Sequence, residues 1–284
     1  MKDNFRIIVA VFFLVLGSAE VHAASQAVLH PEDRLVKTGE EVMLRVRLMS
    51  GGLGFLQRPV SGERVEFFLG ERILGQALTD GNGWGVRRFK PSEEGTITVG
   101  VQLPETARFK AAPVDLILSV IPPSTPLLLV HLSTTRTPSL PPAVPFSPAP
   151  VPEPMEGAVE DLEALSEDFQ LVYLETGSEN LTPRFREWVF GQGFPDAPLF
   201  VWPAPGPPEA AKGIIKDRIG GLKEAGWINF EAGVTRAAPI AEALKELNIK
   251  SVMMVEEDQD AEEIPEGVKT VTAWKNLSAF LRGR

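Results

Sequence analysis

The pattern of apolar and polar positions changes partway along the chain. From Glu41 to Met49 apolar and polar residues alternate, which predicts a half-buried antiparallel strand. Similar segments follow at short intervals between Gly, Asn, Asp and Pro turns, at residues 64–69, 73–79, 84–89, 96–103 and 114–120. Short strands at this spacing are typical of an all-β sandwich. We therefore expect an antiparallel sandwich domain over residues 26–121.

The segment 79–83 (TDGNG) predicts a hairpin between two of these strands, because its residues tolerate positive φ. Asp80 and Asn82 have the spacing that opens an EF-hand loop. Trp84 stands where a further ligand is needed, however, and no glutamate closes the loop. The sequence therefore favours a turn over a calcium site.

After Pro126 the alternation ends, and residues 127–135 (LLLVHLSTT) run from a continuous apolar stretch into a polar turn. A continuous apolar run predicts a buried parallel strand, here Leu127 to Leu132. Helical and strand patterns then alternate, which is typical of an α/β three-layer, parallel-sheet domain of the Rossmann type over residues 127–284. Residues 122–126, rich in proline, form the linker between the two domains.

Within this second domain we expect helices at residues 156–167, 183–192, 208–223, 237–247 and 275–282, and further strands at 170–175, 199–202, 227–230 and 251–255. In the second helix Thr182 is the expected cap and Pro183 suits the first turn. Trp188 and Trp202 are expected in the core. The dense prolines of residues 137–154 predict an extended excursion, either a surface loop or a partner-docking segment.

Polar residues follow the first strand of this domain at its carboxyl end: His131, Ser133, Thr134 and Thr135. Ligands and catalytic groups collect at the carboxyl ends of strands in open α/β sheets. We therefore expect any site to lie there.

This register resembles the haloacid-dehalogenase-like phosphohydrolases, in which four apolar residues precede Asp-x-Asp-x-Thr. His131 stands at the first Asp, Ser133 at the second, and Thr135 matches the Thr. The resemblance implies an aspartate nucleophile, a second aspartate as general acid/base, and Mg²⁺ beside them. This sequence lacks both aspartates.

The order of later segments is similar to the lipin-type, phosphatidate-phosphatase-like branch of that family. The matching segments are QLVYLET at 170–176, GFPDAPL at 193–199 and a lysine on the next helix, Lys212. The resemblance implies that Lys212 steadies a phosphoryl group, although a solvated helix lysine fits equally well. Glu175, with Thr176 beside it, replaces the expected serine and would repel phosphate. Glu231 is the one carboxylate in the segment INFEAGVTRAAP, where metal ligands are expected.

These substitutions predict a domain that keeps the phosphohydrolase fold and has lost the reaction, with no catalytic residue and no metal site or cofactor. One acid and one lysine do not assemble a Mg²⁺-dependent phosphoryl-transfer site. A histidine nucleophile at His131 remains an alternative. The positions that could still bind an anion are His131, Ser133, Thr135, Glu175, Thr176, Lys212 and Glu231.

The segment 59–90 resembles bacterial immunoglobulin-like domains, with a Gly-x-x-Val-x-Phe strand and a Thr-Asp-x-x-Gly hairpin. The resemblance implies a spacer or binding module rather than an enzyme.

The net charge, the amino-terminal segment and the absence of cysteine exclude some classes of function. A net charge of −10 argues against non-specific nucleic-acid binding. Residues 1–23 read as a secretory signal peptide, with a positive start, a short apolar core and Val-His-Ala before the cleavage point. We expect export to the periplasm or beyond, with no stable membrane span after cleavage; a retained anchor is the alternative. The chain has no cysteine, which excludes disulfides and thiolate metal sites.

Three hypotheses follow. The first is a binding or scaffolding protein of the cell envelope, with an unknown protein or a small anionic ligand as partner. The second is a divergent phosphohydrolase acting on a phosphatidate-like lipid or another phosphoester, with Mg²⁺. The third is a purely structural spacer.

Overall fold

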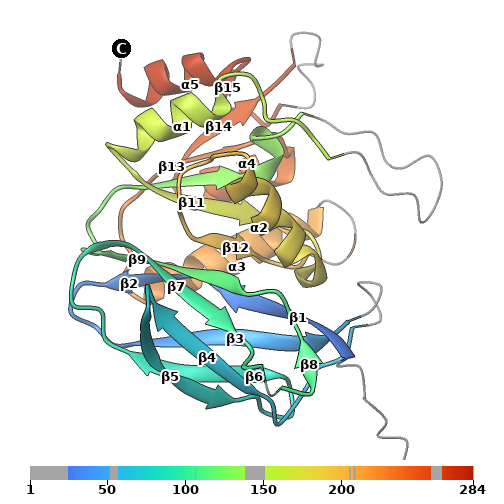
Figure 1. Cartoon of the computed structure of the whole chain (residues 1–284). Coiled ribbons are helices and arrows are strands. Elements are labelled where there is room, and N and C mark those ends of the chain that lie inside the picture. Colours follow the sequence, from blue (N-terminus) through green and yellow to red (C-terminus); the bar gives the residue numbers. More distant parts are fainter. Residues whose placement is uncertain are drawn as a thin grey trace, which may run out of the picture.

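The computed structural model describes residues 25–51, 57–105, 107–137, 151–204, 206, 209–256 and 264–283. A β-sandwich is followed by an α/β domain with a six-stranded, all-parallel sheet (Figure 1), as the sequence predicts. The expected signal peptide and residues 138–150 of the proline-rich excursion lie outside the described residues.

The sandwich consists of two sheets with strand orders β6-β3-β1-β8 and β2-β9-β7-β4-β5. The strands are β1 (Ser25–Glu32), β2 (Arg34–Lys37), β3 (Val42–Ser50), β4 (Arg64–Leu69), β5 (Arg72–Leu78), β6 (Trp84–Phe89), β7 (Gly95–Gln102), β8 (Phe109–Lys110) and β9 (Val114–Ile121). The alternating positions Leu44, Val46 and Leu48 are fully buried in its core. The sandwich is not purely antiparallel, because β1 pairs with β8 and β2 with β9 in parallel. The sequence pattern did not indicate β1, β2 or β8.

The turn at 79–83 is present, but the hairpin prediction is wrong. The Asp80 carboxylate accepts hydrogen bonds from the amides of Asn82 (2.8 Å) and Trp84 (2.9 Å), and Gly83 has a φ of 81°. However, β5 pairs with β4, and β6 pairs with β3 in the other sheet. The turn therefore carries the chain from one sheet to the other, which turn residues alone do not reveal.

The parallel sheet has the strand order β12-β11-β10-β13-β14-β15. Its strands are β10 (Leu127–His131), β11 (Gln170–Glu175), β12 (Leu199–Val201), β13 (Phe230–Thr235), β14 (Lys250–Met254) and β15 (Lys269–Val271). Its helices are α1 (Ala158–Ser166), α2 (Thr182–Gly191), α3 (Glu209–Glu224), α4 (Ala238–Glu246) and α5 (Trp274–Leu281).

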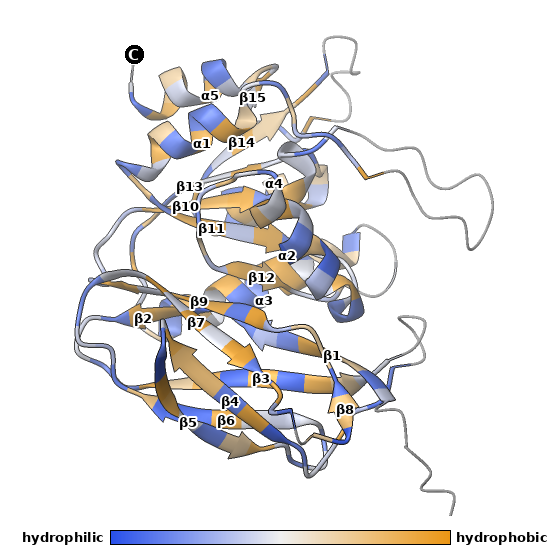
Figure 2. Ribbon diagram, viewed as in Figure 1, coloured by the Kyte–Doolittle hydropathy of each residue, from blue (hydrophilic) through white to orange (hydrophobic). Residues whose placement is uncertain are grey.

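Two apolar cores cover the two faces of this sheet. Leu128 and Val130 pack against α1, α2 and α5, whereas Leu127 and Leu129 pack against α3 and α4. Every residue of β10 is buried, which confirms the prediction of an inner strand. In Figure 2 the strands of this sheet are largely hydrophobic, while the sandwich strands alternate.

Several local predictions need correction. The strand expected at 227–230 is instead β13, since Trp227 is a buried residue before the strand and the small residues Ala232 and Gly233 continue it. Thr182 does not cap α2: Leu181 is the N-cap, and the side chain of Ser178 caps the preceding 3₁₀ turn instead. The strand β15 was not predicted. Trp188 and Trp202 are buried, as expected.

The two domains share part of a core. Ile121 of β9 and Leu35 of β2 belong to the same apolar cluster as Trp227 and Phe230 of the α/β domain. The linker thus joins two domains in direct apolar contact.

A buried ion pair also crosses this interface. Asp33, between β1 and β2, is paired with Arg186 of α2 and accepts hydrogen bonds from the amides of Ile117 (2.8 Å) and Leu199 (2.9 Å). Arg186 also donates to the carbonyl of Asp115. Burial raises the pKa of the Asp33 carboxyl, while the Arg186 guanidinium and the two amides act in the opposite direction. Leu199 opens the edge strand β12, so Asp33 satisfies an amide that its sheet leaves unpaired.

Candidate functional site

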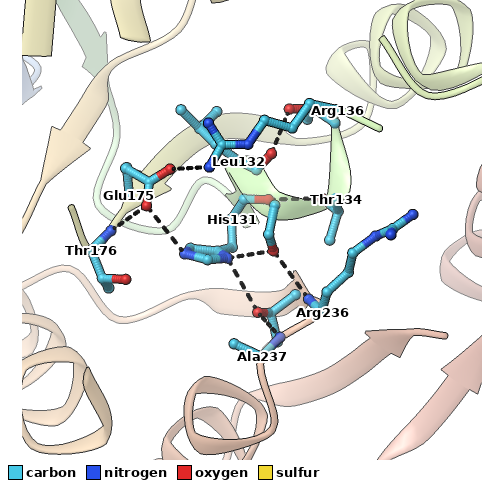
Figure 3. A network of polar contacts seen from close by, with 11 residues as sticks. His131, Leu132, Thr134, Arg136, Glu175, Thr176, Arg236 and Ala237 are labelled. Carbon is cyan, nitrogen blue, oxygen red and sulfur yellow. Dashed lines mark hydrogen bonds and ion pairs between the residues drawn. The ribbon is translucent and has the colours of Figure 1, made fainter. Parts of the chain in front are cut away.

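The sheet order reverses between β10 and its neighbour β13, and open α/β sheets bind ligands at such a switch point. Three adjacent strands end here in polar residues: β10 at His131, β11 at Glu175 and β13 at Thr235. Figure 3 shows these strand ends converging into one network of polar contacts. We call this network the switch-point cluster: His131, Ser133, Arg136, Glu175, Thr235 and Arg236.

His131 lies at the centre of the cluster. Its Nδ1 is 2.6 Å from the hydroxyl oxygen of Ser133 and 3.4 Å from that of Thr235. Its Nε2 is 3.8 Å from a carboxylate oxygen of Glu175. Burial lowers the pKa of His131 to about 4, and the nearby charge of Arg136 acts in the same direction. The imidazole is therefore neutral at pH 7, and its contact with Glu175 is not an ion pair at that pH.

Glu175 is held by other partners. One oxygen accepts a hydrogen bond from Arg136 (3.1 Å), and the other accepts one from the amide of Thr176 (2.9 Å). Burial raises the pKa of the Glu175 carboxyl, and the Arg136 guanidinium opposes this shift. Glu175 is thus matched by Arg136, and its charge is less repulsive to an anion than the sequence suggested.

The third part of the cluster comes from the end of β13. The amide of Arg236 donates to the hydroxyl of Ser133 (3.3 Å), and the amide of Ala237 donates to that of Thr235 (3.0 Å). The Arg236 guanidinium contacts Glu256 (3.4 Å) and the sulfur of Met155 (3.2 Å). The Nε atom of Arg236 and the Nε2 atom of His131 are buried without a hydrogen-bond partner in the described part of the chain.

The structure brings together four of the seven residues expected at the site. These are His131, Ser133, Glu175 and, through its backbone amide, Thr176. Thr135 is buried at the same strand end, but its hydroxyl donates to the carbonyl of Leu132 (3.0 Å).

Lys212 and Glu231 make their contacts away from this cluster. Lys212 lies between two carboxylates of α4 and donates hydrogen bonds to Glu242 (2.8 Å) and Glu246 (2.6 Å), which raise the pKa of its ammonium group. Lys212 is thus paired with α4, and its implied role in steadying a phosphoryl group stays a prediction. Glu231 lies near the amino end of β13, opposite to the end that carries the site, and is paired with Lys250 (2.8 Å).

Sequence reasoning missed Arg136, Thr235 and Arg236. A signal was available, because Thr235 and Arg236 end an apolar strand just before a helix that begins with a proline in its first turn. The strand was predicted at 227–230, so Thr235 and Arg236 were not recognised as the carboxyl end of β13.

The side chains of the cluster do not form a Mg²⁺ site, because Mg²⁺ is bound through oxygen ligands, mainly carboxylates. The carboxylate available is that of Glu175, and Arg136 already occupies one of its oxygens. Nowhere in the described ranges do three or more His, Asp or Glu side chains gather in a metal-binding arrangement.

No family model matches the chain, and no curated protein matches its sequence. Some solved structures are similar to its amino-terminal region. Fibronectin(III)-like modules of Clostridium thermocellum CbhA match at 12% identity with a TM-score of 0.26, covering 34% of this chain and 48% of that one.

A CARDB domain from Pyrococcus furiosus matches at 15% identity with a TM-score of 0.24, covering 34% of this chain and 94% of that one. Domains 4 and 5 of the S-layer protein SbsC match at 11% identity with a TM-score of 0.21, covering 34% of this chain and 51% of that one. At these TM-scores the likeness carries no argument about the fold or the function of the amino-terminal domain. In the described ranges no helix is long and apolar enough to cross a membrane.

Proposed function

We propose that this chain is an exported binding or scaffolding protein of the cell envelope. In this proposal the α/β domain is a phosphohydrolase-like fold, of the haloacid-dehalogenase type, that recognises a small anion without turning it over. The immunoglobulin-like sandwich serves as its rigid support, because the shared core and the Asp33–Arg186 pair hold the domains together.

The observation that carries this proposal is that His131 is buried and uncharged at the end of β10. A neutral, buried imidazole replaces the nucleophilic carboxylate at the strand end, and the nearest carboxylate, Glu175, is bound by Arg136. Phosphoryl transfer depends on an in-line nucleophile and on metal ions that neutralise the developing charge. The cluster contains donors for binding an anion, and its one carboxylate, Glu175, is engaged by Arg136, which supports recognition without phosphoryl transfer through an aspartate-type nucleophile.

Recognition of an anion rests on unused hydrogen-bonding capacity. Nε of Arg236 and Nε2 of His131 are both buried and without a partner among the described residues. Buried polar atoms normally have a partner, so unused hydrogen-bonding capacity on each of these two groups supports the recognition of an anion. Inorganic phosphate is the simplest probe of that chemistry.

The test combines turnover and binding. With Mg²⁺ present, the purified protein should release no phosphate from phosphatidate or from p-nitrophenyl phosphate above the buffer background. Calorimetric titration with inorganic phosphate should give a saturable signal that Arg236→Gln weakens by about tenfold, the loss expected for a charged hydrogen bond. The exposed Arg184→Gln is the matched control. Phosphate release with Mg²⁺ would contradict the proposal.

A second candidate is a hydrolase that uses Ser133 as its nucleophile. The observation in its favour is the 2.6 Å contact between the Ser133 hydroxyl and Nδ1 of His131, the geometry of a nucleophile and its base. A histidine with a pKa near 4 is a weak base at pH 7, which argues against this candidate. Hydrolysis of an ester or phosphoester that disappears in Ser133→Ala would establish it.

Export and the spacer alternative have their own tests. Amino-terminal sequencing of the exported protein should begin at Ala24, whereas an intact Met1 in a membrane fraction would indicate a retained anchor. A purely structural spacer would bind phosphate no better in the wild-type protein than in Arg236→Gln.

A further inference from the structure

The protein binds the carboxylate of Glu175 in the way that a site binds a free anion. One oxygen accepts a hydrogen bond from the Arg136 guanidinium (3.1 Å), and the other accepts one from the amide of Thr176 (2.9 Å). Both partners are donors, which matches an ionised carboxylate that accepts at its two oxygens. The Glu175 carboxylate therefore fills a small site made of groups from the chain itself.

A second amide and a buried imidazole belong to the same site. Burial raises the pKa of the Glu175 carboxyl, whereas the charge of Arg136 and hydrogen bonds from the amides of Thr176 and Gly177 lower it. Nε2 of His131 is 3.8 Å from the same carboxylate and has no hydrogen-bond partner among the described residues. We call the Arg136 guanidinium, the amides of Thr176 and Gly177 and the His131 imidazole the Glu175 cradle.

The cradle lies where open α/β sheets bind ligands. Thr176 and Gly177 directly follow β11, and His131 ends the neighbouring strand β10, so these groups meet at the carboxyl ends of two paired strands. Figure 3 shows the Glu175 carboxylate joined to Arg136, His131 and Thr176. The Arg136 side chain is 31% exposed and that of Glu175 is 7% exposed, so part of the cation is open to solvent while its carboxylate partner is buried.

Contacts that do not involve the Glu175 side chain hold the cradle in shape. The Arg136 guanidinium lies 5.8 Å from the centroid of the Phe185 ring, and the Arg136 backbone pairs with Pro154. Gly177 approaches the same ring so closely that an added Cβ atom would lie 3.1 Å from Cζ of Phe185. Removal of the Glu175 side chain should therefore leave the donors in place, and preorganised donors bind an anion at a lower entropic cost.

We propose that the Glu175 cradle is a binding site for a carboxylate or phosphate group, which the chain closes with its own carboxylate. In the wild-type protein Glu175 competes with a free anion for Arg136, so a ligand must displace Glu175 to bind there. This inference rests on the proposed function, because it concerns anion recognition at the same strand ends.

The test removes the internal carboxylate and supplies a free one. Acetate has the same two carbons and two oxygens as the part of the side chain that Glu175→Ala removes. Acetate should raise the melting temperature of this variant by roughly 5 °C at about 100 times its dissociation constant, because it binds the folded state alone. Neutral acetamide, and sodium chloride at equal ionic strength, should not. The wild type, whose cradle is filled, should not respond to acetate either.

Two further variants locate the bound acetate. In the Glu175→Ala background, Arg136→Gln should abolish the shift in melting temperature, because it removes the cation of the cradle. Glu231→Ala is the matched control, since it also removes a carboxylate that is paired with a cation, Lys250, but the two side chains are 39% and 40% exposed. The proposal is wrong if acetate stabilises Glu175→Ala no more than it stabilises Glu231→Ala.

Glu175→Gln keeps the proposal testable if Glu175→Ala does not fold. Glutamine keeps the shape of the side chain and removes its charge, so Arg136 becomes available to a free anion. Calorimetric titration with inorganic phosphate should show binding about tenfold tighter than in the wild type, and Arg136→Gln should reverse this gain. Unchanged phosphate binding in Glu175→Gln would overturn the proposal. In whichever variant folds, comparison of acetate with phosphate distinguishes a carboxylate from a phosphate ligand.

Failure of this inference and failure of the proposed function give different results. If the wild type binds no phosphate and acetate stabilises Glu175→Ala, the cradle is present and Glu175 keeps it closed, so the proposed function alone is wrong. If the wild type binds phosphate and Glu175→Ala does not respond to acetate, the anion is bound without the cradle, and the inference alone is wrong.

Discussion

At the scale of single residues, the most unusual feature is a histidine at the end of the most buried strand. His131 is 6% exposed and is surrounded by hydroxyls, a carboxylate and an arginine. The neighbouring Arg136 disfavours a second positive charge, so burial and electrostatics both hold the ring neutral. Protonation of this one side chain should therefore be linked to unfolding.

This linkage predicts a loss of stability in acid. The unfolded chain protonates His131 near its ordinary pKa of 6.5, whereas the folded protein does so only near 4. As the pH falls from 7 to 4.5, the unfolded state binds the proton first, which lowers the free energy of unfolding by about 2 to 3 kcal/mol. Urea denaturation of the wild type and of His131→Asn at several pH values measures this difference.

The raised pKa of Glu175 acts with the opposite sign, since its protonation in acid favours the folded state. Glu175 is present in both proteins, so the comparison with His131→Asn isolates the histidine. Equal pH dependence of the two proteins would mean that His131 titrates normally in the folded state.

At the scale of elements, the close approach of β13 and α4 depends on a residue without a side chain. A Cβ atom on Gly233 would lie 2.6 Å from Cδ1 and 3.1 Å from Cδ2 of Leu244. Leu244 is 1% exposed and belongs to the core formed with α3 and α4, so it has little room to move. Gly233 therefore allows the helix to pack directly on the strand that ends in the site.

Gly233→Ala should destabilise the protein by about 1 to 3 kcal/mol, the usual cost of overpacking a core. Gly220→Ala is the matched control, because no atom lies within 4 Å of the added Cβ and the residue is inside α3. That change should stabilise the helix by up to about 1 kcal/mol. Chemical denaturation of both variants tests the contrast, which fails if Gly233→Ala is as stable as Gly220→Ala.

At the scale of the whole molecule, Asp33 and Arg186 tie the sandwich to the α/β domain. The two residues are 153 positions apart in the sequence, and both are buried. Their contacts reach β9, α2 and the edge strand β12. Together with the shared apolar core, this pair should make the two domains unfold as one unit.

Arg186→Ala should cost about 3 to 5 kcal/mol, because it leaves the Asp33 carboxylate buried without its cation. Calorimetry should show one transition for the wild type and a broader or split transition for the variant. Arg184→Ala, an exposed arginine on the same helix, should melt like the wild type. If Arg186→Ala also melts like the wild type, the domains are held together by apolar contacts alone.

The amino-acid pattern alone was enough to predict those elements whose signal is local. The alternation of residues 41–49 and the continuous apolar run of residues 127–130 correctly predicted a sandwich strand and an inner parallel strand, because burial on one face or on two leaves different periods. The polar residues after β10 were also correctly placed at the end of a strand.

The tertiary structure alone decided which polar groups meet. Lys212 pairs with α4 rather than approaching His131, and Arg136, Thr235 and Arg236 complete a cluster whose members come from separate strands. The pairing of β6 with β3 and the pairing of Asp33 with Arg186 also join residues that are distant in sequence. The local pattern of apolar and polar residues indicates which residues are buried. Which distant residue a polar side chain contacts depends on how the elements pack together.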